Sequence, residues 1–175
     1  MDAEITTERL FLRPFTEDDA DALFAIFRRP EVARWSGSGE PMVDRQQAVD
    51  RIAGQPARVG EHPAASILAI VPLGETEPVG MTLLVPLPPS AGVERHDFEI
   101  GWHLHPETWG RGYATESARA MIARAAEAGM PEVYAVTDPS NERSQAVCRR
   151  LGMTDLGLTS DWYDRELRAF RLAVS

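Results

Sequence analysis

A glycine-rich turn between two strongly patterned segments constrains the fold of this chain more than any other feature of its sequence. Before the turn, residues 97–105 (DFEIGWHLH) place apolar side chains at every second position, which predicts a strand. After it, apolar residues repeat at helical spacing over residues 115–128, which predicts a helix. The turn itself, residues 109–115 (WGRGYAT), joins the strand to the N-terminus of that helix. The chain should therefore contain a sheet with a helix packed against it.

The remaining segments continue this alternation of strands and helices. Residues 86–93 (PLPPSAGV) are predicted to form a loop because of their proline content. The order of elements predicts an α/β (α+β) fold in which helices cover a mixed central sheet. Helices are predicted behind the capping-box sequence of residues 16–19, ending before Pro30, and over residues 44–54 and 141–151. Further strands are predicted at residues 8–15, 66–71, 79–85, 133–137 and 170–174.

Length and composition bound the class of protein. A chain of 175 residues is expected to form one domain, residues 1–175. Its first ten residues lack the apolar run of a signal peptide and no segment is apolar enough to cross a membrane, which predicts a cytoplasmic protein with no membrane partner. The single cysteine, Cys148, excludes an internal disulfide and a cysteine-cluster zinc site. A net charge of −9 disfavours nucleic acid as a partner and is compatible with a cationic ligand.

The glycine-rich turn is suited to binding an anion. Gly110 and Gly112 allow the backbone to approach a ligand closely, and the first amides of the following helix have no partner within the helix. Those amides also lie at the positive end of the helix dipole, so a pyrophosphate is a suitable ligand. An ordinary glycine-rich turn is the alternative. The Lys-Ser/Thr ending of a Walker loop is missing, which disfavours a nucleotide-binding protein.

Several blocks of sequence, in order along nearly the whole chain, resemble the GNAT acyltransferase superfamily. Residues 112–114 (GYA) match the Gly-x-Gly/Ala half of its pyrophosphate loop, and Trp109 stands where Gln or Arg is usual, as in the RimJ/RimL-type branch. Residues 141–144 (NERS) and 151–153 (LGM) are similar to its motif B, and residues 7–13 to the opening of that branch. The resemblance implies a mostly antiparallel mixed sheet flanked by helices. It also implies an acetyl-CoA-dependent N-acetyltransferase of a protein N-terminus or small-molecule amine, and it is compatible with a homodimer.

The resemblance also implies roles for individual residues. Main-chain amides of residues 111–115 hold the pyrophosphate, and main-chain groups of residues 102–104 pair with the pantetheine arm where two strands splay apart. Asn141 bonds that arm or its neighbouring backbone, although a plain helix N-cap explains an asparagine at this position equally well. The acetyl-CoA site implied in this way comprises Trp102, His103, Leu104, Trp109, Gly110, Arg111, Gly112, Tyr113, Ala114, Thr115, Asn141 and Ser144.

Glu99 is the candidate general base. Acyl transfer to an amine at neutral pH requires removal of the ammonium proton. The alternation of the strand places Glu99 on the same face as Gly101 and His103, and Glu99 resembles the base glutamate of the histone-acetyltransferase branch. The alternative is a solvent-facing glutamate that pairs with a neighbouring arginine.

The leaving thiolate has a less obvious proton donor. Many family members use a tyrosine of motif B, and Cys148 occupies that position here. A small buried residue on the apolar side of its helix is the preferred interpretation of Cys148, over a thiol that accepts the acetyl group. The resemblance places Ser144 near the sulfur, where it could steady the thiolate. Direct attack, with Ser144, water or the amine proton serving the thiolate, is therefore preferred to ping-pong chemistry.

Trp35 is the candidate for the acceptor side, because it lies in a glycine-rich loop after the first helix, where this family builds that side. The other tryptophans and the histidines are assigned to packing and ordinary hydrogen bonds, and no metal is expected. The identity of the acceptor stays open. A second class of function also stays open, a non-catalytic sensor that binds acyl-CoA without turning it over.

Overall fold

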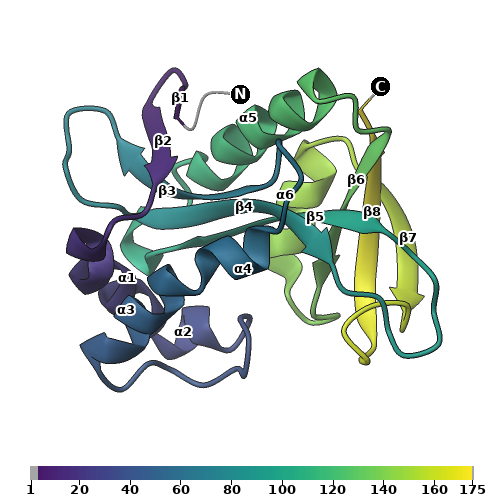
Figure 1. Cartoon of the computed structure of the whole chain (residues 1–175), viewed down its shortest axis with the longest axis horizontal. Helices are drawn as coiled ribbons and strands as arrows, with labels where there is room; N and C mark the ends of the chain where they lie inside the picture. The colour runs from purple at the N-terminus through teal and green to yellow at the C-terminus, as the bar shows by residue number, and fades with distance from the viewer. Residues whose placement is uncertain (1–3, 175) are drawn as a thin grey trace.

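The computed structural model of this chain describes residues 4–174 and contains an eight-stranded sheet with helices on both faces (Figure 1). The strand order is β1-β2-β3-β4-β5-β6-β8-β7. β5 and β6 run parallel, and every other neighbouring pair is antiparallel. The predicted mixed, mostly antiparallel sheet with flanking helices is confirmed. The strands are β1 (Ile5–Thr6), β2 (Leu10–Pro14), β3 (Ser66–Pro72), β4 (Gly80–Leu87), β5 (Asp97–Leu104), β6 (Glu132–Thr137), β7 (Thr154–Thr159) and β8 (Leu167–Ala173).

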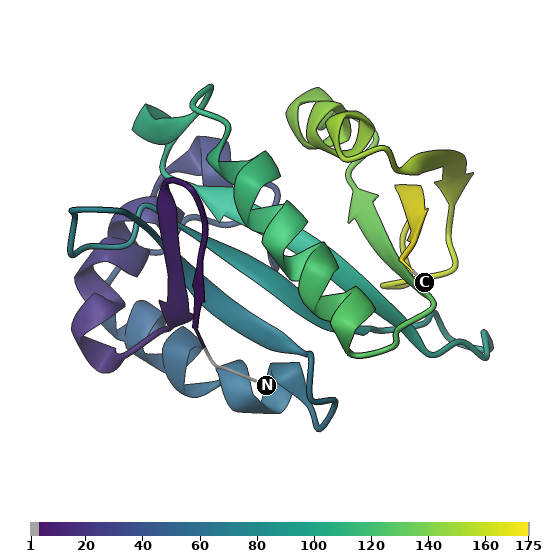
Figure 2. The same cartoon turned by 90° about the horizontal axis from the view of Figure 1, so that it is seen from above.

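The helices divide between the two faces of the sheet (Figure 2). α1 to α4 cover one face, and α5, with α6 beside it, covers the other. None of the helices within residues 4–174 combines the length and the apolar character that a membrane span requires. The helices are α1 (Ala20–Phe27), α2 (Pro30–Ala33), α3 (Arg45–Ala53), α4 (Gln55–Val59), α5 (Tyr113–Glu127) and α6 (Glu142–Arg150), with short 3-10 helices at Glu17–Asp19 and Pro106–Thr108.

Strand β3 shows why both faces of the sheet are covered. Its side chains alternate between two hydrophobic clusters and are buried on both sides. Leu68 and Ile70 pack into the cluster that contains Met121 of α5, whereas Ile67 and Ala69 pack into the cluster formed with α1 and α3. A strand buried on both faces reads as a continuous apolar run, and residues 66–71 (SILAIV) have this pattern.

The structure differs from the sequence-based predictions at several boundaries. The sequence predicts no strand at β7, because this edge strand is largely exposed and a bulge between Asp155 and Gly157 interrupts its alternation. β8 begins at Leu167, ahead of the predicted residues 170–174. β4 extends through Pro86 and Leu87, which the sequence assigns to a loop, and α5 begins two residues before the predicted start at Thr115.

Candidate active site

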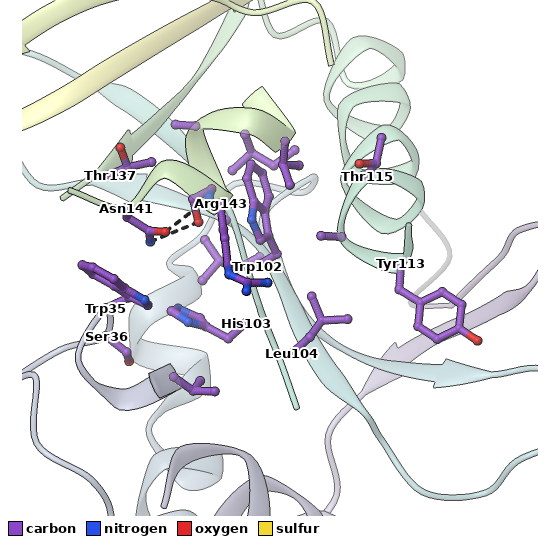
Figure 3. A pocket seen from close by; sticks show the side chains of 18 of the residues that line it. Trp35, Ser36, Trp102, His103, Leu104, Tyr113, Thr115, Thr137, Asn141 and Arg143 are labelled. Carbon is purple, nitrogen blue, oxygen red and sulfur yellow. Dashed lines mark hydrogen bonds between the residues drawn. The ribbon is translucent and has the colours of Figure 1, made fainter. Parts of the chain in front are cut away.

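A pocket of about 1470 Å³ opens where the parallel strands β5 and β6 separate. These strands pair at a single position, Glu99 with Tyr134, whereas β4 and β5 pair along their whole length. Beyond that position, residues of both strands line the pocket together with the N-terminal ends of α5 and α6 and the loop after α2. The splayed strands that the resemblance implies are therefore present. Figure 3 shows Trp102, His103 and Leu104 of β5 on the pocket wall, facing Asn141 of the segment before α6.

The glycine-rich turn forms the wall of the pocket at the start of α5. Gly110 and Gly112 have φ angles of +78° and +81°, in the left-handed region that favours glycine. The first backbone bond of the helix runs from the Glu116 amide to the Gly112 carbonyl at 3.0 Å, so the three preceding amides have no partner within the helix. The buried Thr115 hydroxyl also lacks a hydrogen-bond partner among the described residues. Unpaired donors at a helix N-terminus fit the pyrophosphate of a coenzyme A.

Arg111 differs from the rest of the predicted loop. Its neighbours Trp109, Gly110 and Gly112 line the pocket, whereas Arg111 is not among the lining residues. The Arg111 carbonyl accepts a hydrogen bond from Nη1 of Arg9 at 2.8 Å. The structure therefore gives Arg111 a place in holding the loop, and its predicted contact with the pyrophosphate stays a prediction.

Arg9 and Glu116 connect the loop to the start of β2, a contact that the sequence does not predict. Glu116 accepts hydrogen bonds from the Arg9 amide at 2.8 Å, from Arg9 Nε at 2.7 Å and from the Thr7 hydroxyl at 2.6 Å. These bonds and the positive charge of Arg9 hold the pKa of Glu116 below its usual value, against the opposing effect of burial. Arg9 lies 107 positions from Glu116 in the sequence, so no local pattern indicates their contact.

Asn141 and Ser144 meet at the start of α6. Asn141 caps the helix through its side-chain oxygen, which accepts from the Ser144 amide at 3.2 Å, so the N-cap interpretation is confirmed. Its amide group donates to Ser144 Oγ at 3.2 Å, and both side chains line the pocket (Figure 3). Because the Ser144 oxygen accepts this bond, its own proton is available to donate elsewhere. The buried hydroxyl of Thr137, at the end of β6, also lines the pocket and has no partner among residues 4–174.

Glu99 lies in the pocket and is paired with an arginine. Its side chain is 15% exposed, and its Oε2 accepts from the Tyr163 hydroxyl at 2.5 Å and from Arg58 Nη2 at 3.3 Å. Burial raises the pKa of Glu99 above its usual value, and the Tyr163 bond and the Arg58 charge offset part of that rise. Glu99 therefore does pair with an arginine, but its carboxylate faces the pocket and not bulk solvent.

Tyr163 and Arg58 complete this cluster, and no pattern in the sequence predicts a role for either residue. Tyr163 lies in the turn between β7 and β8 with a φ of +60°, which is unusual for a residue other than glycine. Arg58 Nη2 also donates to the Tyr163 hydroxyl at 2.5 Å, and Nη1 donates to the Pro86 carbonyl at 2.9 Å. Burial and the Glu99 charge raise the pKa of Tyr163, so its hydroxyl stays protonated at neutral pH.

Trp35 lies on the pocket wall beside Ser36 and near His103 (Figure 3). Its ring stacks under the Arg34 guanidinium, which lies 4.0 Å from the ring centre. Trp102 and Trp109 also line the pocket, and the Trp109 indole donates to the Leu104 carbonyl at 3.0 Å. Trp162 instead lies in the core, 1% exposed.

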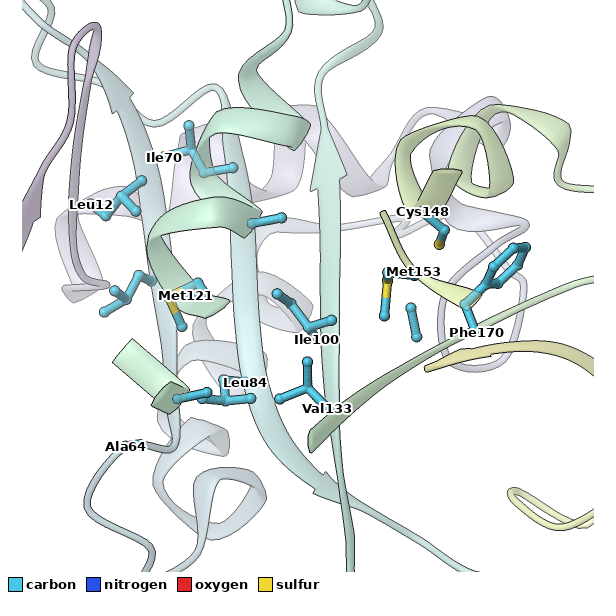
Figure 4. Packing of buried hydrophobic residues seen from close by; sticks show 14 of the residues in the cluster. Leu12, Ala64, Ile70, Leu84, Ile100, Met121, Val133, Cys148, Met153 and Phe170 are labelled. Atoms are coloured by element: carbon cyan, nitrogen blue, oxygen red, sulfur yellow. The ribbon is translucent and has the colours of Figure 1, made fainter. Parts of the chain in front are cut away.

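Cys148 lies outside the pocket. Figure 4 shows its thiol directed into the core beside Met153 and Phe170. Cys148 is fully buried, and burial raises its pKa to about 12, so the thiol is neutral at physiological pH. The structural interpretation of Cys148 is therefore confirmed.

The histidines are used for packing and local hydrogen bonds. His62 accepts from the Ala64 amide and His105 from the Glu107 amide, as expected. His103 packs against Phe27, with ring centres 5.3 Å apart. Within residues 4–174, no three histidine, cysteine or acidic side chains gather closely enough to hold a metal ion.

Comparison with known proteins identifies the fold and the family of this domain. The family model described as Acetyltransferase (GNAT) domain matches residues 9–154. The uncharacterized N-acetyltransferase YoaA of Bacillus subtilis (strain 168) is 30% identical over 156 residues, which are 88% of this chain and 84% of that protein.

Solved structures of acetyltransferases have the same fold. The acetyltransferase from Agrobacterium tumefaciens str. C58 superimposes with a TM-score of 0.77 at 26% identity, covering 98% of this chain and 95% of that one. RimL, a ribosomal L7/L12 alpha-N-protein acetyltransferase solved in complex with coenzyme A, superimposes with a TM-score of 0.77 over 97% of both chains. At 17% identity, RimL shares the fold alone.

Proposed function

This chain belongs to the GNAT acetyltransferase family, and from that premise we propose that it transfers an acetyl group from acetyl-CoA to a primary amine by direct attack. The observation that most supports this proposal is the convergence of two features on one pocket. The unpaired amides and the Thr115 hydroxyl at the start of α5 line it, and so does the half-buried carboxylate of Glu99. Acyl transfer from a coenzyme to an amine requires a site that holds the coenzyme and a base that removes the amine proton, and both features line the same pocket.

In this proposal the unpaired amides at the start of α5 form the binding site for the pyrophosphate of the coenzyme, which we call the pyrophosphate cradle. When bound, acetyl-CoA supplies the acetyl group as a thioester. The amides of Tyr113, Ala114 and Thr115 receive the pyrophosphate, and the Thr115 hydroxyl donates to the same anion. The main-chain groups of residues 102–104 and the Thr137 hydroxyl receive the pantetheine arm along the gap between β5 and β6. The Leu104 carbonyl is already bonded to Trp109, so the remaining main-chain groups carry this contact.

Glu99 acts as the base. Its Oε2 is bonded to Tyr163 and Arg58, which holds the carboxylate in place and leaves Oε1 to accept the ammonium proton. The neutral amine then forms a bond to the acetyl carbon as the carbon–sulfur bond breaks, and the second proton, which the nitrogen loses on becoming an amide, neutralises the departing thiolate. Ser144 donates a hydrogen bond to the departing thiolate sulfur, because its oxygen is held by Asn141 while its proton is free to donate.

The acceptor enters from the side of Trp35. This ring lies on the pocket wall next to His103, on the face of β5 that also carries Glu99. Trp109 in the glycine-rich turn and residues 7–13 support a place in the RimJ/RimL-type branch, whose acceptors include protein N-termini.

A coenzyme-release assay tests the proposal. Wild-type protein with acetyl-CoA is screened against N-terminal peptides, polyamines and aminoglycosides, and binding of acetyl-CoA is measured by calorimetry on the same preparation. Release that depends on one class of amine, with an acetylated product of matching mass, supports the proposal. Tight binding without turnover of any amine would instead indicate a non-catalytic acyl-CoA sensor.

A further inference from the structure

Arg51, in the last turn of α3, is a pocket-lining cation without a carboxylate partner. Its guanidinium lies 3.9 Å from the centre of the Phe27 ring, and its Nη2 donates to Ser36 Oγ at 3.2 Å. No acidic side chain among residues 4–174 forms an ion pair with it or affects its pKa. Burial lowers the pKa of Arg51 to about 10, so the group still carries its charge at neutral pH.

Comparison with Arg58 shows that a half-buried arginine without a carboxylate partner is unusual within this pocket. Arg51 and Arg58 are the two half-buried arginines of the pocket wall, and the other lining arginines are exposed. Arg58 is paired with Glu99, and Glu31, a carboxylate of the wall, is paired with Arg29. A partly desolvated charge without a counter-ion costs free energy, which a bound anion recovers. Of the two half-buried arginines in the lining, Arg51 is thus the one without an ion-pair partner among residues 4–174.

The position of Arg51 assigns that missing anion to the acceptor. Along β5, Ile100 and Leu104 face the cluster under α5, whereas Glu99 and His103 lie on the opposite face. Arg51 stacks on Phe27, which contacts His103, so it lies on the face of β5 that carries Glu99, opposite the face that α5 covers. The pyrophosphate that we place at the start of α5 is therefore not the natural ligand of Arg51.

His103 supports the same conclusion. Burial and the neighbouring Arg51 charge lower the pKa of His103 to about 3, which keeps its ring neutral. A neutral imidazole can donate one hydrogen bond to an anion without adding a second charge to balance. Arg51 and His103 thus offer a charge and a hydrogen-bond donor on one stretch of wall.

We propose that Arg51 binds a carboxylate of the acceptor, so that the substrates of this enzyme are amines that also carry a carboxylate. This inference rests on the proposed function. His103 and Glu99 are four residues apart on β5, about 13 Å along an extended strand. The carboxylate therefore binds at one end of this wall and the amine at the other, which favours acceptors whose two groups are separated by several bonds. Either an ω-amino acid or a short acidic peptide offers this arrangement.

The test compares matched acceptors in a coenzyme-release assay with acetyl-CoA. One series contains ω-amino acids of increasing chain length, each beside its carboxamide, and a second contains alanyl-aspartate and alanyl-asparagine peptides with amidated C-termini. Wild-type kcat/KM should be about ten- to a hundredfold higher for the carboxylate than for its amide, as expected for a charge-assisted hydrogen bond. The series with the larger ratio identifies which of the two sources is the substrate.

Variants of Arg51 then locate the selectivity. The ratio should fall towards one in Arg51→Met, which keeps the aliphatic stem over Phe27, and be partly retained in Arg51→Lys. Arg45→Met is the control, because Arg45 lies on the same helix, is 47% exposed and pairs with Asp21 outside the pocket. Since the ratio is taken within one variant, a lower folded fraction does not affect it.

The failures of the two proposals are distinguishable. Turnover of neutral amines and carboxylates with equal kcat/KM would overturn the role of Arg51 and leave the acetyltransferase activity standing. So would a ratio that persists in Arg51→Met, or a change confined to the KM for acetyl-CoA. Absence of turnover with every amine would overturn the proposed function itself.

Discussion

The two ends of the pocket are built in different ways. The donor end, residues 109–115 with Asn141 and Ser144, presents main-chain amides and short side chains from two helix N-termini. The acceptor end consists of long side chains from separate elements. These are Trp35 after α2, Arg51 of α3, Arg58 of α4, Glu99 and His103 of β5 and Tyr163 after β7.

This difference indicates which substitutions each end of the pocket tolerates. Amides at a helix N-terminus exist whatever the side chains are, so a cradle made from them requires only glycines and a helix start. Side chains from α3, α4 and a distant turn can change one by one without disturbing the sheet. We therefore expect changes at the acceptor end to act on rate and selectivity. Changes within residues 109–115 should act on coenzyme affinity, whereas a change at Ser144, which we propose lies beside the departing sulfur, should act on rate.

Glu99→Gln should have the largest effect on rate. The amide keeps the volume and can still accept a hydrogen bond from Tyr163, but it cannot take the amine proton. We expect kcat to fall by about 10²–10⁴-fold, the usual loss for general acid–base catalysis, with little change in acetyl-CoA affinity by calorimetry.

The pH profile sharpens this prediction. Because burial raises the pKa of Glu99, wild-type activity should fall on acidification at a higher pH than an ordinary carboxylate would cause. That acid limb should be absent in Glu99→Gln. The loss of kcat relative to wild type should shrink at high pH, where the amine loses its proton unaided. Full activity of the variant near neutral pH would contradict the assignment and leave water as the base.

Gly112→Asp should have the largest effect on the donor end. The new carboxylate would lie in front of the amides that receive the pyrophosphate, and a Cβ there would meet Arg9 Nη2 at 3.2 Å. We expect acetyl-CoA to bind about a hundredfold more weakly in calorimetry, since charge-assisted hydrogen bonds to the anion are lost. Gly74→Asp is the matched control, because Gly74 has a similar φ of +90° and open space around its Cβ position. Equal affinity in the two variants would refute the cradle.

Tyr163→Phe should have a smaller effect, confined to the acceptor end. The hydroxyl donates to Glu99 and favours its charged form, so removing it should raise the pKa of Glu99. The acid limb of kcat/KM should move to higher pH by about one unit, while the rate on the alkaline plateau changes little. Tyr134→Phe is the control, because that hydroxyl bonds Glu132 and Arg95 away from the pocket. An unshifted limb would show that Tyr163 does not act on the base.

The same contrast explains which parts of the molecule the sequence predicts. The glycine-rich turn and the start of α6 are continuous segments whose spacing indicates their geometry, so the fold around the donor end follows from local pattern. Tyr163 and Arg58 are separated by 105 positions and meet only through the sheet. Neither lies in a segment whose apolar residues repeat at strand or helix spacing. The turn that carries Tyr163 follows β7, whose mostly exposed side chains lack the apolar alternation that indicates a strand. Strand alternation indicates the face of β5 on which Glu99 lies, but no pattern in the sequence indicates its partners Tyr163 and Arg58.

Cys148→Ala should have the smallest effect on rate and the clearest effect on stability. Cys148 occupies the position where related enzymes are expected to carry a tyrosine, yet its thiol is buried beside Met153 and Phe170 and is not among the residues that line the pocket. With a pKa near 12, it neither donates a proton readily at neutral pH nor forms a nucleophilic thiolate. We expect kcat/KM to remain at the wild-type value. The small cavity should lower the free energy of unfolding by about 1 kcal/mol, visible as a shift of roughly 2–4 °C in thermal melting.

Ser144→Ala, one turn earlier on the same helix, provides the converse of this prediction. Ser144 lines the pocket, so its loss should lower kcat while the melting temperature changes little. An acetyl group trapped on Cys148 and detected by mass spectrometry, together with an inactive alanine variant, would reverse the direct-attack mechanism. The two variants would thus distinguish the face of α6 that packs in the core from the face that we propose serves the reaction. Such a division would explain how a thiol occupies the position where the resemblance implies a tyrosine without taking part in the chemistry.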